Sequence, residues 1–204
     1  MGGGNHLPVL RAPPARPPQA VLRYTFGMHG RRALFSILLS FFALTACRTA
    51  PPPALAPADE PAILGAAREI IAAAGFCALI TIGEDGHPQA RVMDPAAPDA
   101  RMAVTLMTNP SSRKVAQIAR DPRVTLFYFD SESLGYVTIV GRAAQILDPE
   151  EKRRRWLDRW SPHIARPEDA VLYEVVPERV EVVSVALGVT GDEGTWTPPS
   201  IDLR

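Results

Sequence analysis

Apolar and polar residues alternate along much of residues 61–187, and this period of two is typical of strands with one buried face. A helical period, with apolar residues three or four apart, replaces it in three stretches. Short turns separate most of the alternating stretches, which favours antiparallel neighbours and a small β-barrel. The expected helices span 61–75, 110–120 and 149–160. The expected strands span 76–82, 87–93, 101–108, 123–130, 136–147, 171–176 and 180–185.

Glycine and proline mark where the strands turn or bend. Residues 83–86 read as a hairpin turn, because their two glycines can adopt the positive φ angles of tight turns. Gly141 interrupts the longest strand, which predicts a bulge or a sharp bend. Residues 177–179 are the expected link between the last two strands. Residues 188–204 are rich in Gly, Thr and Pro, so we expect a loose C-terminal tail.

The stretch from Met107 to Ile118 combines the end of a strand with the start of a helix. Asn109 is the expected N-cap and Pro110 the first helical residue, where a missing N–H costs little. Free N–H groups, hydroxyls and cations in one turn form a cradle for phosphate. A capped surface helix with solvated charges is the alternative explanation. The side chains of this candidate cradle are those of Ser111, Ser112, Arg113 and Lys114.

The first 60 residues differ in composition from the rest, and much of the chain's proline lies there. Residues 1–27 lack a hydrophobic period, so we expect disorder, and Met28 is a second candidate for the start of translation. Residues 28–47 join a short basic region to an apolar run too short to span a bilayer comfortably, as a signal peptide does. Residues 48–60 form a tether rich in Pro and Ala.

The apolar run ends in Leu44-Thr45-Ala46-Cys47, which resembles the lipobox of bacterial lipoproteins. The resemblance implies lipidation of Cys47 and a protein held at a membrane face without a spanning helix. An Arg rather than an Asp at position 48 implies the outer membrane in bacteria with two membranes. Arg31-Arg32 partly matches a twin-arginine export signal. We expect an exported protein anchored at the periplasmic or external face. The alternatives are an ordinary signal peptide, a short membrane anchor, or a cytoplasmic protein whose signal is not used.

Composition argues against several functions. The 22 Lys and Arg balance the 22 Asp and Glu, whereas a general nucleic-acid binder should carry a basic excess, so we expect no nucleic-acid partner. Cys47 and Cys77 are too few for a disulfide framework or a metal site, and Cys77 lies in an apolar strand that should bury it. His87 and His163 lack partners at ligand spacing, so we expect no metal. No Ser/His/Asp set or carboxylate pair indicates a hydrolytic centre.

The order of elements and motifs resembles the pyridoxamine 5′-phosphate oxidase-like family, the FMN-binding split barrels, over about residues 61–185. Its most specific part is Thr108-Asn109-x-x-Ser112-Arg113-Lys114-Val115-Ala116-Gln117-Ile118, followed by Asp121-Pro122-Arg123-Val124. Residues 136–143 and 88–93 continue the match. The resemblance implies a mainly β fold, a six- to seven-stranded antiparallel split β-barrel with a few flanking helices, as the domain at 61–187.

The resemblance also implies roles for single residues. Arg113 and Lys114 would bind the FMN phosphate with help from neighbouring hydroxyls and N–H groups. Arg91 would lie beneath the flavin, and the backbone of the next two residues would contact the ring edge. Tyr136 stands where the well-known oxidases carry a Gln that reaches the flavin from the partner subunit, which implies a homodimer with the cofactor at its interface. The expected cofactor-binding residues are Arg91, Val92, Met93, Met107, Thr108, Asn109, Ser112, Arg113, Lys114 and Tyr136.

One departure from the family bears on function. The oxidases that make pyridoxal phosphate carry an Arg-x-His pair near their C-terminus, and residues 195–204 contain none. The chain therefore looks closer to the general-stress-protein branch. We expect an FMN-binding oxidoreductase with an unknown small-molecule substrate or electron donor, and not a pyridoxal phosphate-forming oxidase. The alternative is a non-catalytic stress protein that binds flavin, F420 or haem, although haem would need an axial ligand such as His and none is obvious.

Overall fold

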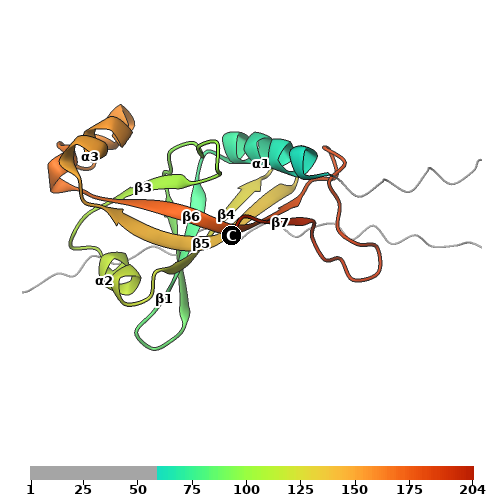
Figure 1. Cartoon of the computed structure of the whole chain (residues 1–204), viewed down its shortest axis with the longest axis horizontal. Helices are drawn as coiled ribbons and strands as arrows, with labels where there is room; N and C mark the ends of the chain where they lie inside the picture. Colours follow the sequence, from blue (N-terminus) through green and yellow to red (C-terminus); the bar gives the residue numbers. More distant parts are fainter. Residues whose placement is uncertain (1–58) are drawn as a thin grey trace, which may run out of the picture. The chain divides into compact units, whose positions relative to one another are not determined.

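A computed structural model describes residues 59–204, which form seven strands and three α-helices (Figure 1). The expected disorder at 1–27, the signal peptide at 28–47 with Cys47, and most of the tether at 48–60 lie outside the described residues. In chain order the elements are α1 (Glu60–Ala74), β1 (Cys77–Ile82), β2 (Pro88–Met93), β3 (Val104–Thr108), α2 (Arg113–Arg120), β4 (Arg123–Asp130), β5 (Gly135–Ile146), α3 (Pro149–Arg155), the short 3-10 helices η1 (Asp158–Trp160) and η2 (Pro167–Asp169), β6 (Val171–Val183) and β7 (Ser200–Asp202).

All seven strands belong to one antiparallel sheet in the order β2-β1-β4-β5-β6-β3, and β7 pairs with β6. The strands β3 and β7 pair with opposite ends of the same edge of β6, because β5 occupies the other edge. The long strands β5 and β6 run side by side across the molecule (Figure 1). Long strands twist strongly, which lets one sheet enclose a core. The expected mainly β, antiparallel fold is confirmed.

Alternation places one face of this sheet in the core. On β4, Val124, Leu126 and Tyr128 point inward and are at most 3% exposed. The helix α1 packs its apolar stripe into the same hydrophobic cluster. It begins after Asp59, whose carboxylate caps its first turn, and ends at Gly75, which has a φ of 67°. The buried residues of α1 are Ile63, Ala66, Ala67, Ile70 and Ile71.

The strand β6 is continuous over 13 residues, where the sequence predicted two strands and a link at 177–179. Pro177 lacks the N–H that a regular ladder needs. The register of β5 against β6 shifts between Val140 and Gly141, opposite this proline. A Cβ on Gly141 would lie 2.2 Å from the carbonyl oxygen of Val176. The irregularity expected at Gly141 is confirmed, with the extra residue, Glu178, on β6 opposite Val140 and Gly141, and it lets β6 continue past the proline. The prediction of two separate strands is wrong.

Residues 188–204 are not the loose tail that their composition predicts. Ser200–Asp202 pairs with β6, and Ile201 is buried in the main core at 7% exposure. Val189 forms a bridge back to Ser184, so the segment leaves and rejoins the sheet. The prediction failed because a three-residue strand is too short to show alternation. The folded part therefore extends past the predicted boundary at 187.

The helix expected at 149–160 ends after Arg155. Trp156 has φ −67° and ψ 139°, outside the helical region. Trp160 turns into the molecule, where it is 1% exposed and its Nε1 donates a hydrogen bond of 3.1 Å to the backbone oxygen of Asp94. The two indole rings meet edge to face at 5.6 Å. Burial of this large ring outweighs one further turn of helix.

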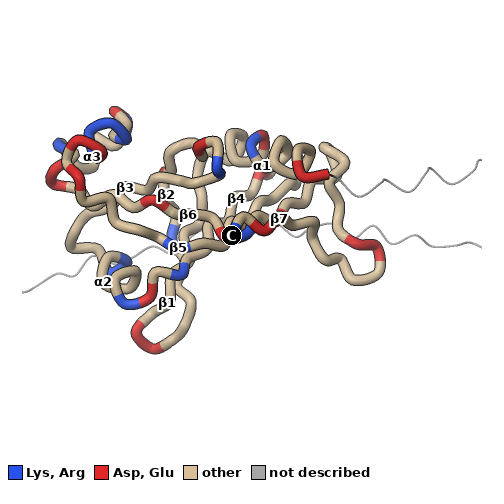
Figure 2. Tube along the Cα trace, viewed as in Figure 1, with Lys and Arg blue, Asp and Glu red and all other residues tan. Residues whose placement is uncertain are grey.

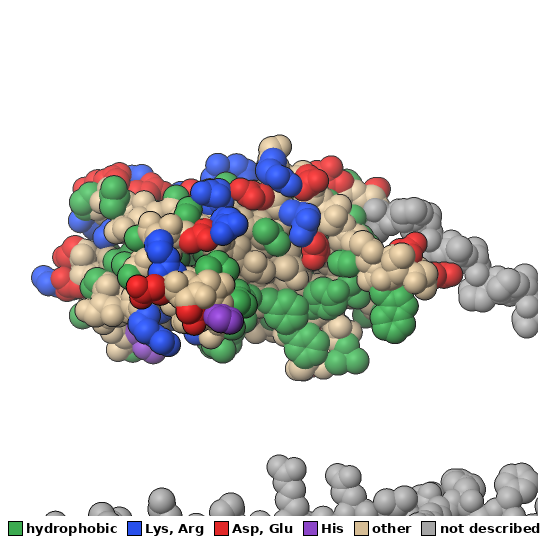
Figure 3. All heavy atoms as spheres, turned by 90° about the horizontal axis from the view of Figure 1, so that it is seen from below, with side chains coloured by type: hydrophobic (Ala, Val, Ile, Leu, Met, Phe, Trp, Pro, Cys, Tyr) green, Lys and Arg blue, Asp and Glu red, His purple; other side chains and the backbone are tan. Residues whose placement is uncertain are grey.

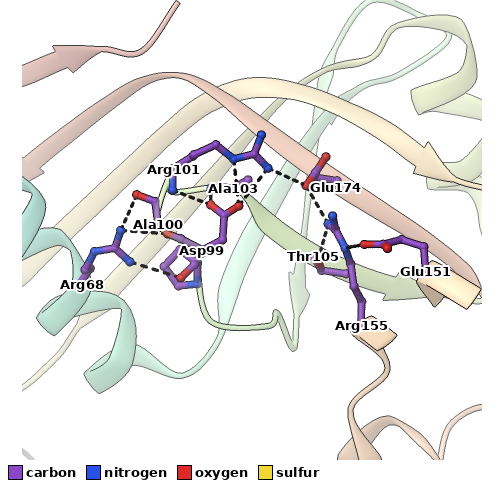
Figure 4. A network of polar contacts seen from close by, with 10 residues as sticks. Arg68, Asp99, Ala100, Arg101, Ala103, Thr105, Glu151, Arg155 and Glu174 are labelled. Atoms are coloured by element: carbon purple, nitrogen blue, oxygen red, sulfur yellow. Dashed lines mark hydrogen bonds and ion pairs between the residues drawn. The ribbon is translucent and has the colours of Figure 1, made fainter. Parts of the chain in front are cut away.

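An ion-pair network ties α3 to the sheet (Figure 4). Arg155 pairs with Glu151 on its own helix, and its Nη1 lies 2.8 Å from a carboxylate oxygen of Glu174 on β6. Arg101 lies 3.5 Å from the same carboxylate and 3.1 Å from Asp99. Partly exposed pairs of this kind contribute up to ~1 kcal/mol each. The network therefore orients α3 more than it stabilises the fold.

Charged residues of both signs are spread over the described elements, and α3 carries acidic residues in its first turn and basic residues in its last (Figure 2). The chain as a whole is formally neutral, but residues 59–204 contain all 22 Asp and Glu and only 16 of the 22 Lys and Arg, so the described part carries a formal net charge of −6. Within residues 59–204, no helix combines the length and the apolar character that crossing a membrane requires.

Candidate functional site

The start of α2 carries the positive charges that the sequence singled out. The residue before the helix is Ser112, and α2 begins at Arg113, so the prediction of Asn109 as N-cap and Pro110 as first helical residue is wrong. These residues form a preceding turn, in which Asn109 Oδ1 accepts a hydrogen bond of 2.8 Å from the Ser111 N–H. That local bond competes with helix capping. No side chain within 59–204 caps α2, so its first N–H groups are available to an anion.

Two hydroxyl groups hold the side chain of Lys114. Its Nζ donates hydrogen bonds of 2.8 Å to Thr108 Oγ1, at the end of β3, and to Ser112 Oγ. An ammonium group has three donors, so one remains for a further acceptor. Burial and the charge of Arg91 lower the pKa of Lys114, because both disfavour its charged form.

Arg91 reaches α2 from β2. Its guanidinium donates hydrogen bonds to the backbone oxygen of Leu79 at 3.2 Å, to Thr81 Oγ1 at 2.6 Å and to Gln117 Oε1 at 2.9 Å. Burial and the charge of Arg113 lower the pKa of Arg91. The arginine is therefore held beside the cations of α2, although like charges repel there.

Arg91, Arg113 and Lys114 form what we call the cationic trio. No Asp or Glu among residues 59–204 forms an ion pair with any of the three, whereas most other arginines of this part have an acidic partner. Uncompensated like charges destabilise a folded protein. An anion bound among them would remove the repulsion and accept charge-assisted hydrogen bonds.

A cavity of about 230 Å³, the site cavity, lies beside Lys114. The ends of β2 and β3, the start of α2 and the segment after η1 form its walls. Six of the ten expected cofactor-binding residues line it. Three more lie close by, because Ser112 accepts a hydrogen bond from Lys114, and Arg91 and Arg113 belong to the cationic trio with Lys114. The lining residues are Val92, Met93, Asp94, Met107, Thr108, Asn109, Lys114, Trp160, His163 and Ile164.

Residues 158–164, which we call the wall segment, form one wall of the site cavity that the sequence did not predict. Asp94 holds it against the end of β2 by an ion pair of 2.9 Å with Arg159 and by the hydrogen bond from Trp160. His163 lines the cavity, although its sequence neighbours gave no sign of a role. The wall segment has no regular period, so only the tertiary structure brings it to the site.

Gln117 was missed because the inward-facing residues of α2 differ from those that the sequence predicts. The helical period of residues 110–120 predicts that Val115, Ile118 and Ala119 face inward, but Ala119 is exposed and Gln117 is buried at 8% exposure. The side chain of Gln117 is buried although it is polar, because its amide oxygen accepts a hydrogen bond from Arg91. In the sequence, the signal was a glutamine directly beside an apolar residue of an amphipathic helix, since a polar side chain buried there needs a hydrogen-bond partner.

Tyr136 does not lie at the site cavity of its own chain. It lines a second, mostly apolar cavity of about 330 Å³ with Val183, Val185 and Trp196. Its ring centre is 5.8 Å from that of Phe127. The chain thus brings nine of the ten expected residues together and leaves Tyr136 on another part of the surface.

The remaining candidate groups have structural roles or no partners. Cys77 is 3% exposed, and burial raises the pKa of its thiol to about 12, so the expected buried, unreactive cysteine is found. Among the described residues, no three His, Cys, Asp or Glu side chains are grouped to hold a metal ion. The chemistry of this part of the chain is therefore concentrated at the trio and the site cavity.

Comparisons with known proteins agree with this architecture. A protein from Clostridium acetobutylicum related to general stress protein 26 of Bacillus subtilis is 18% identical, with a TM-score of 0.58 over 71% of this chain and 96% of its own. General stress protein 26 from Bacillus anthracis is 21% identical, with a TM-score of 0.51 over 58% and 92%. A haem-binding protein from Mycobacterium smegmatis is 20% identical, with a TM-score of 0.55 over 72% and 60%. No curated protein matches the chain.

The solved structures show a shared fold, and a match to a protein family shows which family the chain belongs to. The family described as pyridoxamine 5′-phosphate oxidase matches residues 63–184, more than half of the chain. The matched region contains every member of the cationic trio and every residue that lines the site cavity. The chain therefore belongs to the pyridoxamine 5′-phosphate oxidase family.

Proposed function

We propose that this protein binds FMN and uses it to oxidise or reduce a small molecule. The observation that carries the proposal is the cationic trio, three positive side chains without an acidic partner in the described part of the chain. A phosphate monoester carries nearly two negative charges at neutral pH and accepts several charge-assisted hydrogen bonds. The free donor of Lys114 and the N–H groups at the start of α2 suit such an anion.

The ring of the flavin suits the site cavity. Its walls combine apolar side chains from β2, β3 and the wall segment, which can pack against a planar ring, with an equal number of polar ones, which can bind the ring's polar edge. The family typically binds flavin. Bound flavin supplies hydride or electron transfer, and the residues of this chain bind it, orient it and exclude water. The apolar lining residues are Val92, Met93, Met107, Trp160 and Ile164.

The substrate we propose is a small molecule other than pyridoxine or pyridoxamine phosphate. The oxidases that act on those phosphates grip them with an Arg-x-His pair, which residues 195–204 lack. In this chain part of that segment is built into the sheet as β7. The cationic trio is the one cluster of unpaired positive side chains that we find near the site cavity in residues 59–204, and the flavin phosphate would occupy it.

We further propose a homodimer with the cofactor at its interface. Hydrophobic side chains gather on one face of the molecule (Figure 3). Val92 is 74% exposed and lines the site cavity, and Trp196 is 83% exposed beside Tyr136. Exposed apolar surface of this kind marks interfaces. A second copy on this face would bury it and would let Tyr136 contact the flavin of the other copy, as the family resemblance implies.

Haem is the second candidate, and His163 is the observation that favours it. Its imidazole lines the site cavity, where the sequence showed no obvious axial ligand. A fold neighbour from Mycobacterium smegmatis is a haem-binding protein. F420 also carries phosphate and would use the same cationic trio. A non-catalytic carrier of any of these cofactors would have the same site.

We propose that lipidated Cys47 anchors the domain at the periplasmic or external face of a membrane. The support is the sequence Leu44-Thr45-Ala46-Cys47 after an apolar run, followed by a tether rich in Pro and Ala. Two or more acyl chains suffice for stable membrane attachment.

The visible absorption spectrum of the purified full-length protein tests the choice of cofactor. We expect flavin bands that persist in Arg153→Ala/Arg154→Ala, a control on α3, and disappear in Arg113→Ala/Lys114→Ala. A Soret band that disappears in His163→Ala would favour haem instead. A protein that takes up neither added FMN nor haem would contradict both. Reduction of the bound flavin by NADH, NADPH or reduced F420 then separates an enzyme from a carrier.

A further inference from the structure

Gln117 lies behind the cationic trio, one helical turn after Arg113 on α2. We propose that Gln117 is a positioning residue, which acts by holding Arg91 toward the flavin phosphate. It thereby sets the preference of the site for FMN over riboflavin, the same flavin without its phosphate. This inference rests on the proposed function, and it adds a residue whose role lies outside the direct contacts of the cofactor.

The hydrogen bonds around Gln117 form a closed ring. Gln117 Oε1 accepts from Thr81 Oγ1 at 2.7 Å and from Arg91 Nη2 at 2.9 Å. Thr81 Oγ1 in turn accepts from Arg91 Nη1 at 2.6 Å. The donors and acceptors match throughout, because the hydroxyl donates once and accepts once while the guanidinium only donates. The ring ties α2, β1 and β2 together at the guanidinium of Arg91.

The amide of Gln117 has one favoured orientation. Its Nε2 donates a hydrogen bond of 2.8 Å to Gln89 Oε1, so its oxygen must face Arg91 and Thr81. Thr81 is fully buried and Gln117 is 8% exposed, so water competes little for these bonds. A flip of the amide would leave buried donors facing donors, which is costly. The ring therefore fixes the direction of the arginine side chain.

Electrostatics indicates what this fixed arginine is for. A ring that served only to join α2 to the sheet would work as well with a neutral donor in place of Arg91. Instead it holds a third positive charge beside Arg113 and Lys114, where burial and, after it, the neighbouring like charge lower the pKa values of Arg91 and Lys114. A bound anion would offset both costs. The ring therefore serves binding of the phosphate.

Titration of the purified full-length protein with FMN and with riboflavin, followed by flavin fluorescence, tests this role. Gln117→Met keeps the length of the side chain and removes its hydrogen bonds. We expect it to weaken FMN binding about tenfold, the size of one hydrogen bond to a charged group, and to leave riboflavin binding unchanged. Thr81→Val should act in the same direction. Gln145→Met, an exposed glutamine on β5, is the matched control.

A double variant separates positioning from general damage. Arg91→Ala/Gln117→Met should bind FMN as weakly as Arg91→Ala alone, because Gln117 acts through Arg91. Unchanged FMN affinity in Gln117→Met, equal losses for FMN and riboflavin, or additive losses in the double variant would each overturn the inference. If Gln117→Met does not fold, Thr81→Val is judged by the same comparison. Failure of the wild-type protein to bind FMN would instead overturn the proposed function, and this inference with it.

Discussion

Val92 and Phe127 lie on either side of Ala78, each paired with it from a neighbouring strand. All three side chains therefore point to the outer face of the sheet. Because Val92 also lines the site cavity, the apolar outer face begins at the edge of the cofactor site. The register continues it from Phe129 to Tyr136 and on to Val183. The site cavity and the apolar face are thus one continuous surface.

This continuity predicts that disrupting the face will also weaken cofactor binding. Phe127→Glu places a charge in the middle of the proposed interface, so we expect a monomer with reduced FMN affinity. Light scattering coupled to size-exclusion chromatography measures the mass. Leu147→Glu, at an exposed hydrophobic position directly after β5, should stay dimeric. A wild-type monomer, or a Phe127→Glu dimer with normal FMN affinity, would contradict the interface.

The cationic trio predicts opposite effects of one substitution on stability and binding. Arg113→Ala relieves repulsion, so the melting temperature of the cofactor-free protein should rise slightly, while FMN affinity falls at least about tenfold. Thermal unfolding with and without FMN measures both effects. Arg153→Ala removes an arginine that has an acidic partner, Glu150, and should not raise the melting temperature. A lower melting temperature for cofactor-free Arg113→Ala would show that the charge is compensated.

A pair at the end of α2 predicts a pH dependence of stability. Hydrogen bonds from Arg123 lower the pKa of Asp121 to about 2 from its ordinary 3.8. The folded state thus favours the ionised carboxylate, and its stabilisation is present above pH 3.8 and is lost as the pH falls through 2. Asp121→Asn should therefore melt lower than wild type above pH 4, and the difference should vanish near pH 2. Glu84→Gln, at an exposed carboxylate that forms no ion pair within residues 59–204, is the matched control.

The bulge opposite Gly141 predicts a large difference between two glycine substitutions. Gly141→Ala would press a Cβ into the backbone of β6 and should lower the free energy of unfolding by roughly 2 kcal/mol. Gly65→Ala, on α1 with open space around its Cα, should raise it by roughly 0.5–1 kcal/mol. Chemical denaturation of both variants is the measurement. Equal effects would mean that the sheet adjusts at the bulge.

The proposed anchor predicts a change of location. Cys47→Ala removes the sulfur that would carry the lipid, so the protein should move from the membrane fraction to the soluble exported fraction. Immunoblots of fractionated cells measure this, with Cys77→Ala as a cysteine control. If Cys47→Ala remains in the membrane fraction, the lipid anchor is wrong.

Most strands could be predicted because alternation and turn residues are local signals. The strand expected at 123–130 has the bounds of β4 as observed. β6 was divided in error because Pro177 is a local break signal, whereas the pairing with β5 that carries β6 past the proline is a contact distant in sequence. β7 was missed because its burial depends on β6 and leaves no pattern in three residues. Errors therefore arose where a distant strand decides the structure.

The candidate site likewise combines a contiguous motif, which the sequence shows, with residues that only tertiary contacts bring to it. The motif around Arg113 and Lys114 is contiguous, so its chemistry could be predicted from the sequence. Gln117 and Thr81 become part of the site only through the approach of α2 to β1. His163 follows Lys114 by more than 40 positions in the sequence, and only the tertiary structure shows that both residues line the site cavity.

Two walls of the site cavity come from separate stretches of chain, and this has an evolutionary consequence. The start of α2 and its sheet partners carry the cationic trio, whereas the wall segment forms a separate wall of the cavity and is held by polar contacts to Asp94 and Pro95. Mutations in the wall segment could therefore reshape what reacts at the cofactor without disturbing how the cofactor is anchored. Such a division lets descendants of one ancestor diverge in chemistry while they keep the same inherited prosthetic group.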